Sequence, residues 1–371
     1  MRVLLATYGT RGDVEPIVAL AAKLQSDGAD VQVCAPPDAD SVDLHAWHGA
    51  PLVPFSKAWR SWATEASSAE EKVFDVDQYV SDYIEATYET LARVALNADV
   101  LIASGMLHFV ASSAAEVAGI PHRFVAFSPS VLEPQPWQAH IVPTIDRHRA
   151  SIGLPPIHDI HEHLFTAKPW LAADRILSPD EATTQPTVRS DAWILHDNRP
   201  LPDDLLAFLD AGAPPVYLGF GSMRMSAESS RIGIEAIRAL GHRIVLGRGW
   251  AELDTIDDDG DCFAVDEVNH QALFQRVAAI IHHGGAGTTS TSARAGAPQV
   301  IVPQAADQPY WAKQVVRLGI GAAHLGGILE LSSLLDALRL ALLPETAARA
   351  RSVAASMTST GTAVASARIL R

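Results

Sequence analysis

The feature of the sequence that most constrains its fold is an alternation of short apolar runs with helical patterns, which occurs twice. In the first series, apolar runs at 3–7, 31–34, 100–103 and 124–127 are separated by helical apolar spacing at 14–24 and 109–118. Strands that alternate with helices form parallel sheets with helices on both faces. The N-terminal part of the chain is therefore predicted to be a doubly wound α/β domain.

The alternation restarts in the second half of the chain, after a break. Residues 129–198 are rich in Pro, His and Trp, show no sustained period, and lead into Arg199-Pro-Leu-Pro202, which is typical of a stiff linker. The second series predicts strands at 216–220, 243–246, 262–265, 279–282 and 299–302, with helices at 229–240, 271–276, 288–295 and 310–318.

The length of the chain also favours two domains, because 371 residues exceed one ordinary α/β core. We predict two Rossmann-like doubly wound α/β domains that face a cleft, at 1–198 and 213–354, joined by a linker at 199–212. An Ala-rich helical pattern near the end predicts a C-terminal helix, residues 355–371, that packs back across both domains.

Composition excludes several classes of protein. Apolar residues make up 48% and charged residues 19% of the chain, as in a globular protein. The two cysteines, Cys34 and Cys262, and the absence of a signal-peptide pattern indicate a cytoplasmic protein. No apolar run is long enough to span a membrane, and a net charge of -15 argues against nucleic acid as a partner. An anionic ligand would therefore need local positive potential.

The strongest local signal is Ile281-His-His-Gly-Gly-Ala-Gly-Thr-Thr289, between a predicted strand and a predicted helix. Glycines allow a ligand to approach the backbone, and the N–H groups of a first helical turn suit a phosphate. We expect His282 to add a donor that can become cationic. The other candidate phosphate contacts are Gly284, Gly285, Gly287 and Thr288. A plain Gly-rich turn is the alternative.

A second candidate is the pair Asp307 and Gln308, in Pro303-Gln-Ala-Ala-Asp-Gln-Pro309 after the next predicted strand. A carboxylate beside an amide can bind several sugar hydroxyls. The alternative is that Asp307 caps the helix that follows it.

The first strand-to-helix turn holds a third candidate, Asp13. Ligands of open α/β sheets bind at such turns, where a carboxylate can act as a general base. Arg11 beside it can reach a phosphate. The alternative, that Asp13 only caps a helix starting at Val14, is equally compatible with the sequence.

Histidines 158, 161 and 163 raise the question of a metal site. Only the first two would share a helical face, and no further ligands complete a coordination shell, so we expect no metal. Most of the tryptophans of the N-terminal half are expected to pack in the core or between the domains, with one or two lining an acceptor cleft. They are Trp47, Trp59, Trp62, Trp137 and Trp170.

With these segments placed, the chain resembles the GT-B glycosyltransferases of family 1, in particular the actinobacterial branch of vancomycin-type aglycone glycosyltransferases. It is also similar to mycobacterial glycopeptidolipid glycosyltransferases. The matching segments extend over nearly the whole chain: 1–5, 9–16, 34–38, 148–156, 169–173, 219–222, 248–250, the loop from His282, and Asp307-Gln308.

The resemblance implies an inverting, metal-independent enzyme that moves a hexose or deoxyhexose from a dTDP- or UDP-sugar to a hydroxyl of a natural product, with a glycopeptide antibiotic aglycone favoured. The nucleotide sugar is a cosubstrate, and no cofactor is implied. Matching positions give Asp13 as the catalytic base, Thr10, Arg11 and the residues from His282 to Thr288 as phosphate contacts, Ser222, Arg248 and Val268 as the nucleoside wall, and Asp307 with Gln308 as the sugar contacts.

The chain departs from the family pattern in three places. Asn269-His270 stands where relatives often have Pro-Gln, 129–147 is short for a region that often carries an acceptor loop, and 39–98 matches least, although acceptor choice would lie there. Three alternatives stay open. They are a lipopeptide or glycolipid acceptor, which alone would bring weak membrane association, a nucleotide-sugar epimerase, and a non-catalytic nucleotide-sugar sensor.

Overall fold

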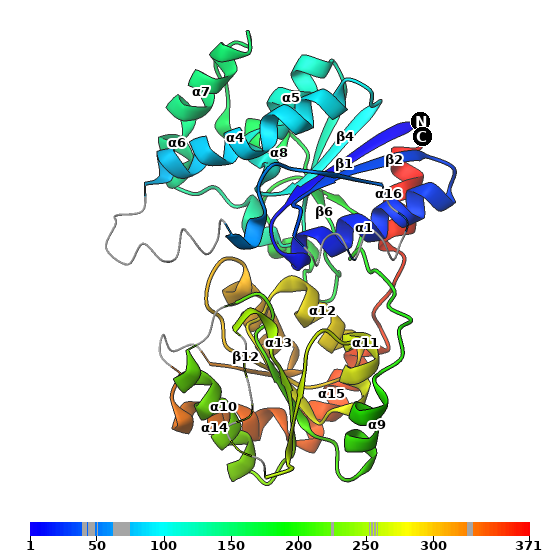
Figure 1. The fold of residues 1–371 in the computed structure, drawn as a ribbon, viewed down its shortest axis with the longest axis vertical. Helices are drawn as coiled ribbons and strands as arrows, with labels where there is room; N and C mark the ends of the chain where they lie inside the picture. The colour runs from blue at the N-terminus through cyan, green and yellow to red at the C-terminus, as the bar shows by residue number, and fades with distance from the viewer. Residues whose placement is uncertain are drawn as a thin grey trace. The chain divides into compact units, whose positions relative to one another are not determined.

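The computed structural model divides the chain into two compact units, each built on one parallel sheet (Figure 1). Unit 1 contains Met1–Ala173, Asp180–Leu195 and Thr358–Arg371, and unit 2 contains Asp174–Pro179 and His196–Met357. The structure describes residues 1–38, 51–61, 75–223, 226–251, 259–324 and 329–371, and the single positions 43, 49, 253, 255 and 257. Within these residues, no helix is long and apolar enough to cross a membrane.

The described sheet of unit 1 has seven parallel strands in the order β3-β2-β1-β4-β5-β6-β7. The strand β1 is central, and its side chains from Val3 to Tyr8 are buried because helices cover both faces. The strands are β1 (Arg2–Tyr8), β2 (Asp30–Ala35), β3 (Leu52–Pro54), β4 (Val100–Gly105), β5 (His122–Ala126), β6 (Trp170–Leu171) and β7 (Val188–Arg189).

The helices of unit 1 come from both ends of the chain. They are α1 (Arg11–Ser26), α4 (Val76–Ala95), α5 (Ala111–Ala118), α6 (Trp137–His140), α7 (Val142–Ser151), α8 (Ile160–Phe165) and α16 (Gly361–Ile369), with short 3-10 turns η1 (Met106–Phe109), η2 (Pro129–Leu132) and η3 (Asp180–Ala182).

The sheet of unit 2 has six parallel strands in the order β10-β9-β8-β11-β12-β13 within the described residues. They are β8 (Val216–Gly219), β9 (Ile244–Gly247), β10 (Cys262–Val265), β11 (Ala279–His282), β12 (Gln299–Ile301) and β13 (Gly321–Ala323). The helices are α9 (Asp203–Asp210), α10 (Ala227–Ala239), α11 (His270–Leu273), α12 (Ala286–Arg294), α13 (Gln308–Leu318), α14 (Leu331–Ala341) and α15 (Pro344–Ala354), with 3-10 turns η4 (Gly249–Ala251) and η5 (Phe274–Arg276).

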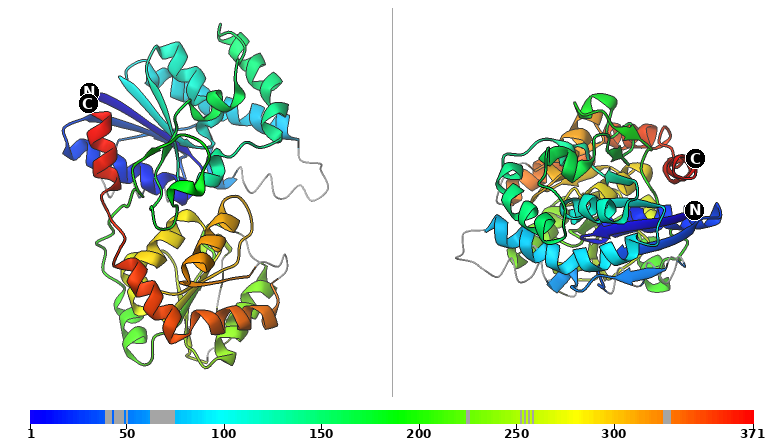
Figure 2. Two further views of the ribbon diagram at one scale, coloured as in Figure 1. Left: turned by 180° about the vertical axis from the view of Figure 1, so that it is seen from behind. Right: turned by 90° about the horizontal axis from the view of Figure 1, so that it is seen from above.

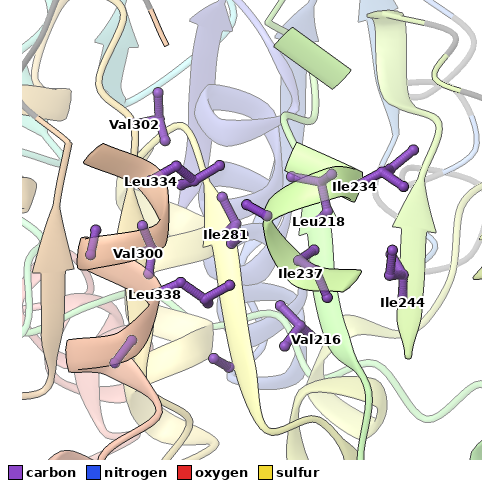
Figure 3. Close-up of a cluster of buried hydrophobic side chains, with 14 of the residues drawn as sticks. Val216, Leu218, Ile234, Ile237, Ile244, Ile281, Val300, Val302, Leu334 and Leu338 are labelled. Carbon is purple, nitrogen blue, oxygen red and sulfur yellow. The ribbon is translucent and has the colours of Figure 1, made fainter. Parts of the chain in front are cut away.

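One core of unit 2 lies between this sheet and two helices on one face (Figure 3). The strands contribute Val216, Leu218, Ile281 and Val300, and α10 and α14 contribute leucines and isoleucines such as Ile237. These side chains are fully buried. Their burial stabilises the ends of β8 and β11, which position the loops discussed below.

The end of the chain returns to unit 1. The C-terminal helix predicted at 355–371 corresponds to α16, which follows α15 after a break where the chain passes from unit 2 to unit 1. Helix α16 packs on α1, with Ala365 and Ile369 in the core, and the Ser366 hydroxyl donates to Asp27 Oδ2 at 2.6 Å. The two termini therefore lie close together (Figure 2).

Two segments differ from the sequence-based expectations. Residues 129–198 are predicted to be irregular, but they contain three helices and two strands, β6 and β7, which are only two residues long and thus too short to show a period. The expected linker at 199–212 belongs to unit 2 and contains α9, whose Leu205 and Leu209 are buried.

Candidate active site

The turn between β1 and α1 is closed by a reciprocal capping box. Thr10 is the N-cap residue, and its hydroxyl accepts from the Gly12 N–H at 3.2 Å, while Asp13 Oδ2 accepts from the Thr10 N–H at 2.9 Å. The helix therefore begins at Arg11, whereas the sequence predicts a start at Val14. The capping role of Asp13 is confirmed, and it fixes the carboxylate at the carboxyl end of the central strand.

The Asp13 carboxylate is packed between two glycines. A Cβ at Gly9 would lie 2.1 Å from Oδ2, so only glycine fits there, and a Cβ at Gly105, at the end of the neighbouring β4, would approach Oδ1 to 3.2 Å. Capping uses Oδ2, and Oδ1 lies beside Gly105. The carboxylate is therefore held beside the carboxyl ends of β1 and β4.

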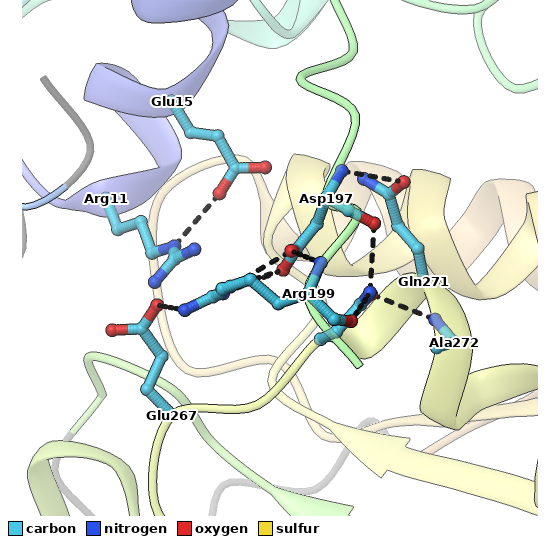
Figure 4. Close-up of polar contacts among 8 residues, drawn as sticks. Arg11, Glu15, Asp197, Arg199, Glu267, Gln271 and Ala272 are labelled. Atoms are coloured by element: carbon cyan, nitrogen blue, oxygen red, sulfur yellow. Dashed lines mark hydrogen bonds and ion pairs between the residues drawn. The ribbon is translucent and has the colours of Figure 1, made fainter. Parts of the chain in front are cut away.

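Arg11 lies one turn before Glu15 on α1, and the two side chains form an ion pair, with Nε to Oε2 at 2.9 Å (Figure 4). Each is about one-third exposed. A phosphate that reached Arg11 would therefore compete with Glu15 for the guanidinium.

The Gly-rich loop of unit 2 connects β11 to α12. Gly284 has a φ of +91°, and Gly285 is the N-cap residue of the helix. The first hydrogen bond within the helix runs from the Thr289 N–H to the Gly285 carbonyl at 3.0 Å. The N–H groups of Ala286, Gly287 and Thr288 come before it, at the open end of the helix. Three converging N–H groups with the positive end of the helix dipole suit an anion.

The expectation that His282 supplies a cationic donor is wrong. Its side chain is fully buried, and burial, the first cause, lowers its pKa to about 3. Both ring nitrogens are used inside the unit, since Nδ1 accepts from the Gly284 N–H at 3.0 Å and Nε2–H donates to Gln299 Oε1 at 2.9 Å. His282 therefore shapes the loop from behind.

The neighbouring His283 falls within the predicted phosphate loop, but the sequence gives it no role of its own. Its ring lies against Gly285 and Gly221, and Nδ1 has no hydrogen-bond partner within the part of the chain that the structure describes. Burial lowers its pKa to about 4, so the imidazole is neutral at pH 7. Strand alternation is the signal that could have separated the two histidines, because His282 is the last residue of β11 and His283 is the first of the loop.

Asp307 and Gln308 are held by hydrogen bonds of their own at the start of α13. Asp307 occupies the N-cap position without capping through its side chain, and its Oδ2 accepts from the Trp311 indole N–H at 2.6 Å. Burial raises its pKa. Gln308 Oε1 accepts from the N–H groups of Gln304 and Ala305 at 2.6 and 3.1 Å. Asp307 is therefore the N-cap residue of α13, as the alternative predicts, although its side chain makes no capping hydrogen bond. The strained turn before it, with Ala306 at a φ of +56°, is fixed by Gln308.

The three residues of the expected nucleoside wall follow different strands. Ser222 follows β8 in a turn whose Gly221 carbonyl accepts from the Trp250 N–H at 2.8 Å, and Arg248 follows β9, with its guanidinium 3.5 Å from Asp266. Val268 is only 7% exposed and packs in a core of the unit. Its side chain therefore cannot line a nucleoside site, and only its backbone is a candidate.

Asn269, one of the departures from the family pattern, has a clear structural role. Its oxygen caps α11 by accepting from the Ala272 N–H, and its nitrogen donates to the carbonyls of Asp197 and Arg199 at 2.9 and 2.8 Å. The side chain of Arg199 bonds to Asp197 and Glu267. Asn269 thus ties the irregular segment before α9 to the segment that carries Val268.

The histidines considered as metal ligands do not converge. His161 Nε2 bonds to the Leu132 carbonyl at 2.9 Å, and His163 is buried. In the described ranges, no three His, Cys, Asp or Glu side chains are arranged to hold a metal ion. Of the tryptophans, Trp170 is buried in β6 and Trp137 is 36% exposed, while Trp47 and Trp62 lie outside the described residues.

Two family models match separate parts of the chain. Residues 3–130 match the glycosyltransferase family 28 N-terminal domain, and residues 234–367 match the C-terminal domain of erythromycin biosynthesis protein CIII-like proteins.

Curated relatives match over almost the full length. The chain is 44% identical to the glycosyltransferase GtfE and to the vancomycin aglycone glucosyltransferase of Amycolatopsis orientalis, with 98% of this chain and 96% of each relative covered. It is 29% identical to an uncharacterized glycosyltransferase of Mycobacterium leprae, with 95% and 92% covered.

Solved structures share the fold. The glycotransferase of kitacinnamycin has a TM-score of 0.77 at 21% identity, with 100% of this chain and 98% of that chain covered. The glycosyltransferase VinC, solved in complex with dTDP, has a TM-score of 0.73 at 22% identity, with 100% and 99% covered.

Two parallel-sheet Rossmann-like domains with a Gly-rich loop before α12 define a glycosyltransferase of the GT-B fold. The chain belongs to the family of vancomycin-type glycosyltransferases, and it is a glycosyltransferase.

Proposed function

We propose that this enzyme transfers a hexose or deoxyhexose from a dTDP- or UDP-sugar to a hydroxyl of a natural product, with a glycopeptide aglycone as the favoured acceptor. The observation that carries the proposal is the 44% identity, over 98% of the chain, to an enzyme named vancomycin aglycone glucosyltransferase. A third relative, 43% identical over 95% of the chain, is named dTDP-epi-vancosaminyltransferase, which supports a dTDP-linked donor.

The loop before α12 is the proposed diphosphate site. Its N–H groups of Ala286, Gly287 and Thr288 and the neutral, partly buried imidazole of His283 are donors for phosphate oxygens. As the sugar–phosphate bond breaks, negative charge grows on the diphosphate, and donors fixed in advance stabilise that charge.

Asp307 and Gln308 are the proposed contacts of the donor sugar. The indole of Trp311 holds the Asp307 carboxylate, and the loop backbone holds the Gln308 amide, so both groups are fixed before a ligand arrives. A buried carboxylate accepts strong hydrogen bonds from hydroxyl groups.

Asp13 is the proposed general base. The carboxylate removes the proton of the acceptor hydroxyl as its oxygen attacks the anomeric carbon, and the diphosphate leaves on the opposite side, so the configuration inverts. This single displacement needs neither a metal ion nor a cofactor.

The test is a transfer assay with dTDP- and UDP-hexoses and three acceptor classes: a glycopeptide aglycone, simple phenols, and lipopeptides or glycolipids. We expect transfer to the aglycone, unchanged activity in EDTA, and a product of inverted anomeric configuration by NMR. Transfer only to the lipid acceptors would overturn the favoured acceptor. Epimerised donor without transfer, or donor binding without turnover, would overturn the proposed function.

A further inference from the structure

A chain of three buried hydrogen bonds links Gly284, His282, Gln299 and Thr289 beside the Gly-rich loop of unit 2. The His282 Nε2–H donates to Gln299 Oε1 at 2.9 Å, and the Gln299 amide N–H donates to the Thr289 carbonyl at 3.3 Å. On the other side of the ring, Nδ1 accepts from the Gly284 N–H at 3.0 Å. The side chains of His282, Gln299 and Thr289 are all fully buried, so water cannot replace these bonds.

Each bond in this chain has only one possible direction. The Thr289 carbonyl accepts only, so the NH2 group of Gln299 must face it, and the amide oxygen must then face His282. The Gly284 N–H donates only, so Nδ1 of His282 must be unprotonated. The neutral Nε2–H tautomer of His282 is therefore the only form that satisfies all three bonds. The lowering of its pKa to about 3, mainly by burial, agrees with this neutral state.

The chain of bonds joins three elements that form the loop. Gln299 lies on β12, His282 ends β11, and Thr289 lies in the first turns of α12. The bond to Gly284 holds the chain at the sharp bend where φ is +91°, and a Cβ at this position would lie 2.4 Å from Ile301 Cγ2. The bend determines where His283 and the first N–H groups of α12 stand.

We propose that Gln299 is a positioning residue for the diphosphate of the donor, acting through the tautomer of His282. It does not touch the ligand itself. The inference rests on the proposed donor site, and it assigns a function to a buried polar side chain on a strand that would otherwise be expected to be apolar.

Two substitutions separate the parts of this role. Gln299→Met keeps the approximate volume and removes both amide bonds. Gln299→Glu keeps an acceptor for His282, provides no donor for the Thr289 carbonyl, and favours the imidazolium, whose Nδ1–H would oppose the Gly284 N–H. Ser366→Ala is the control, because it removes a hydrogen bond made by a fully buried hydroxyl in unit 1, far along the chain from the Gly-rich loop.

The readout is dTDP affinity by calorimetry, measured from pH 6 to 8 beside thermal unfolding. We expect Gln299→Met to bind dTDP about tenfold more weakly, the scale of one lost hydrogen bond, and to raise KM for the donor more than it lowers kcat. In Gln299→Glu the affinity relative to wild type should fall further as the pH decreases. Ser366→Ala should unfold earlier and bind dTDP as wild type does.

Wild-type affinity in both Gln299 variants would overturn the positioning role. Wild-type protein that binds neither dTDP nor UDP would instead overturn the proposed function, so the two failures are distinguishable. If the Gln299 variants do not fold, ¹⁵N NMR of the His282 imidazole in the wild-type protein tests the proposed tautomer directly. A neutral Nε2–H signal for His282 between pH 6 and 8 supports the inference, and an Nδ1–H or doubly protonated ring overturns it.

Discussion

Replacement of His108 by Phe should make the protein more resistant to acid. His108 lies in η1, after the carboxyl end of β4, and is 6% exposed among the rings of Phe109, Phe124 and Phe165. Its Nδ1–H donates to the Gly105 carbonyl at 3.0 Å, and its Nε2 has no partner in the described part of the chain. Phe keeps the aromatic contacts and removes the titratable group.

The magnitude follows from the pKa of His108, which burial lowers from 6.5 to about 4. Because the unfolded chain binds this proton first, the contribution to stability is complete above pH 6.5 and is lost as the pH falls toward 4. Between these two pKa values the free energy of unfolding falls by roughly 1.4 kcal/mol for each pH unit. At pH 5, which is 1.5 units below the unfolded pKa of 6.5, the protein has therefore lost about 2 kcal/mol of stability. The lost bond to Gly105 costs the variant about 1 kcal/mol at any pH.

The assay is urea unfolding followed by tryptophan fluorescence at pH 7, 6 and 5. Between pH 7 and 5, His108→Phe should lose about 2 kcal/mol less free energy of unfolding than wild type does. His140→Phe, the same change at an exposed position, is the control and should follow the wild-type curve. Parallel pH curves for wild type and His108→Phe would refute the idea that the folded state excludes this proton.

Three further predictions concern the proposed site. Asp13→Asn should keep its Tm and donor affinity, because Asn can also accept from the Thr10 N–H, but should lose roughly 10² to 10⁴ in kcat; retained turnover would exclude Asp13 as the base. His283→Ala should weaken dTDP binding by about 1 to 3 kcal/mol, and unchanged calorimetric affinity would contradict this. Burial raises the pKa of Asp307 in the folded protein. At any pH above the pKa of the unfolded chain, near 3.8, the ionisation of this carboxyl therefore opposes folding. Asp307→Asn should therefore keep or raise the Tm at pH 7, bind dTDP normally, and use the intact donor poorly; equal loss of dTDP binding would mean that the pair does not read the sugar.

Of the strands that the structure describes, the sequence predicts β1, β2, β4, β5 and β8 to β12, because buried parallel strands are short apolar runs bounded by Gly or Pro; it misses β3, β6, β7 and β13. The runs at 262–265 and 279–282 coincide with β10 and β11. Helix starts are predicted less well. Helix α1 begins three residues earlier than its apolar pattern, since Arg11, Gly12 and Asp13 belong to a polar cap that periodicity does not detect. The strands β6 and β7 are two residues long and are defined only by their hydrogen bonds to neighbouring strands. The local sequence pattern does not reveal such pairing.

At the candidate site, the sequence predicts which loops matter and not what each side chain does. The loop from β11 to α12 is recognisable from its glycines, whereas the roles of His282 and His283 depend on which ring is enclosed by Gln299, seventeen residues away. Val268 shows the same limit, because its place in a motif does not reveal that its side chain packs in a core. Asp307 looks like a helix cap in sequence, and only the structure shows that Trp311 holds it.

The diphosphate site proposed for this chain, whose net charge is -15, is not strongly basic. Both histidines of the loop are neutral near pH 7, and Arg11 is paired with Glu15. The proposed donors are therefore the backbone N–H groups at the start of α12, which the fold fixes, and the neutral imidazole of His283. Neutral donors cost less to desolvate than cations do, and they retain their direction when water is removed. Neutral donors bind an anion well only when they are held in well-defined positions. In the proposed site, the hydrogen bonds between His282 and Gln299 and between His282 and Gly284 hold the loop in place, and a basic side chain is not required.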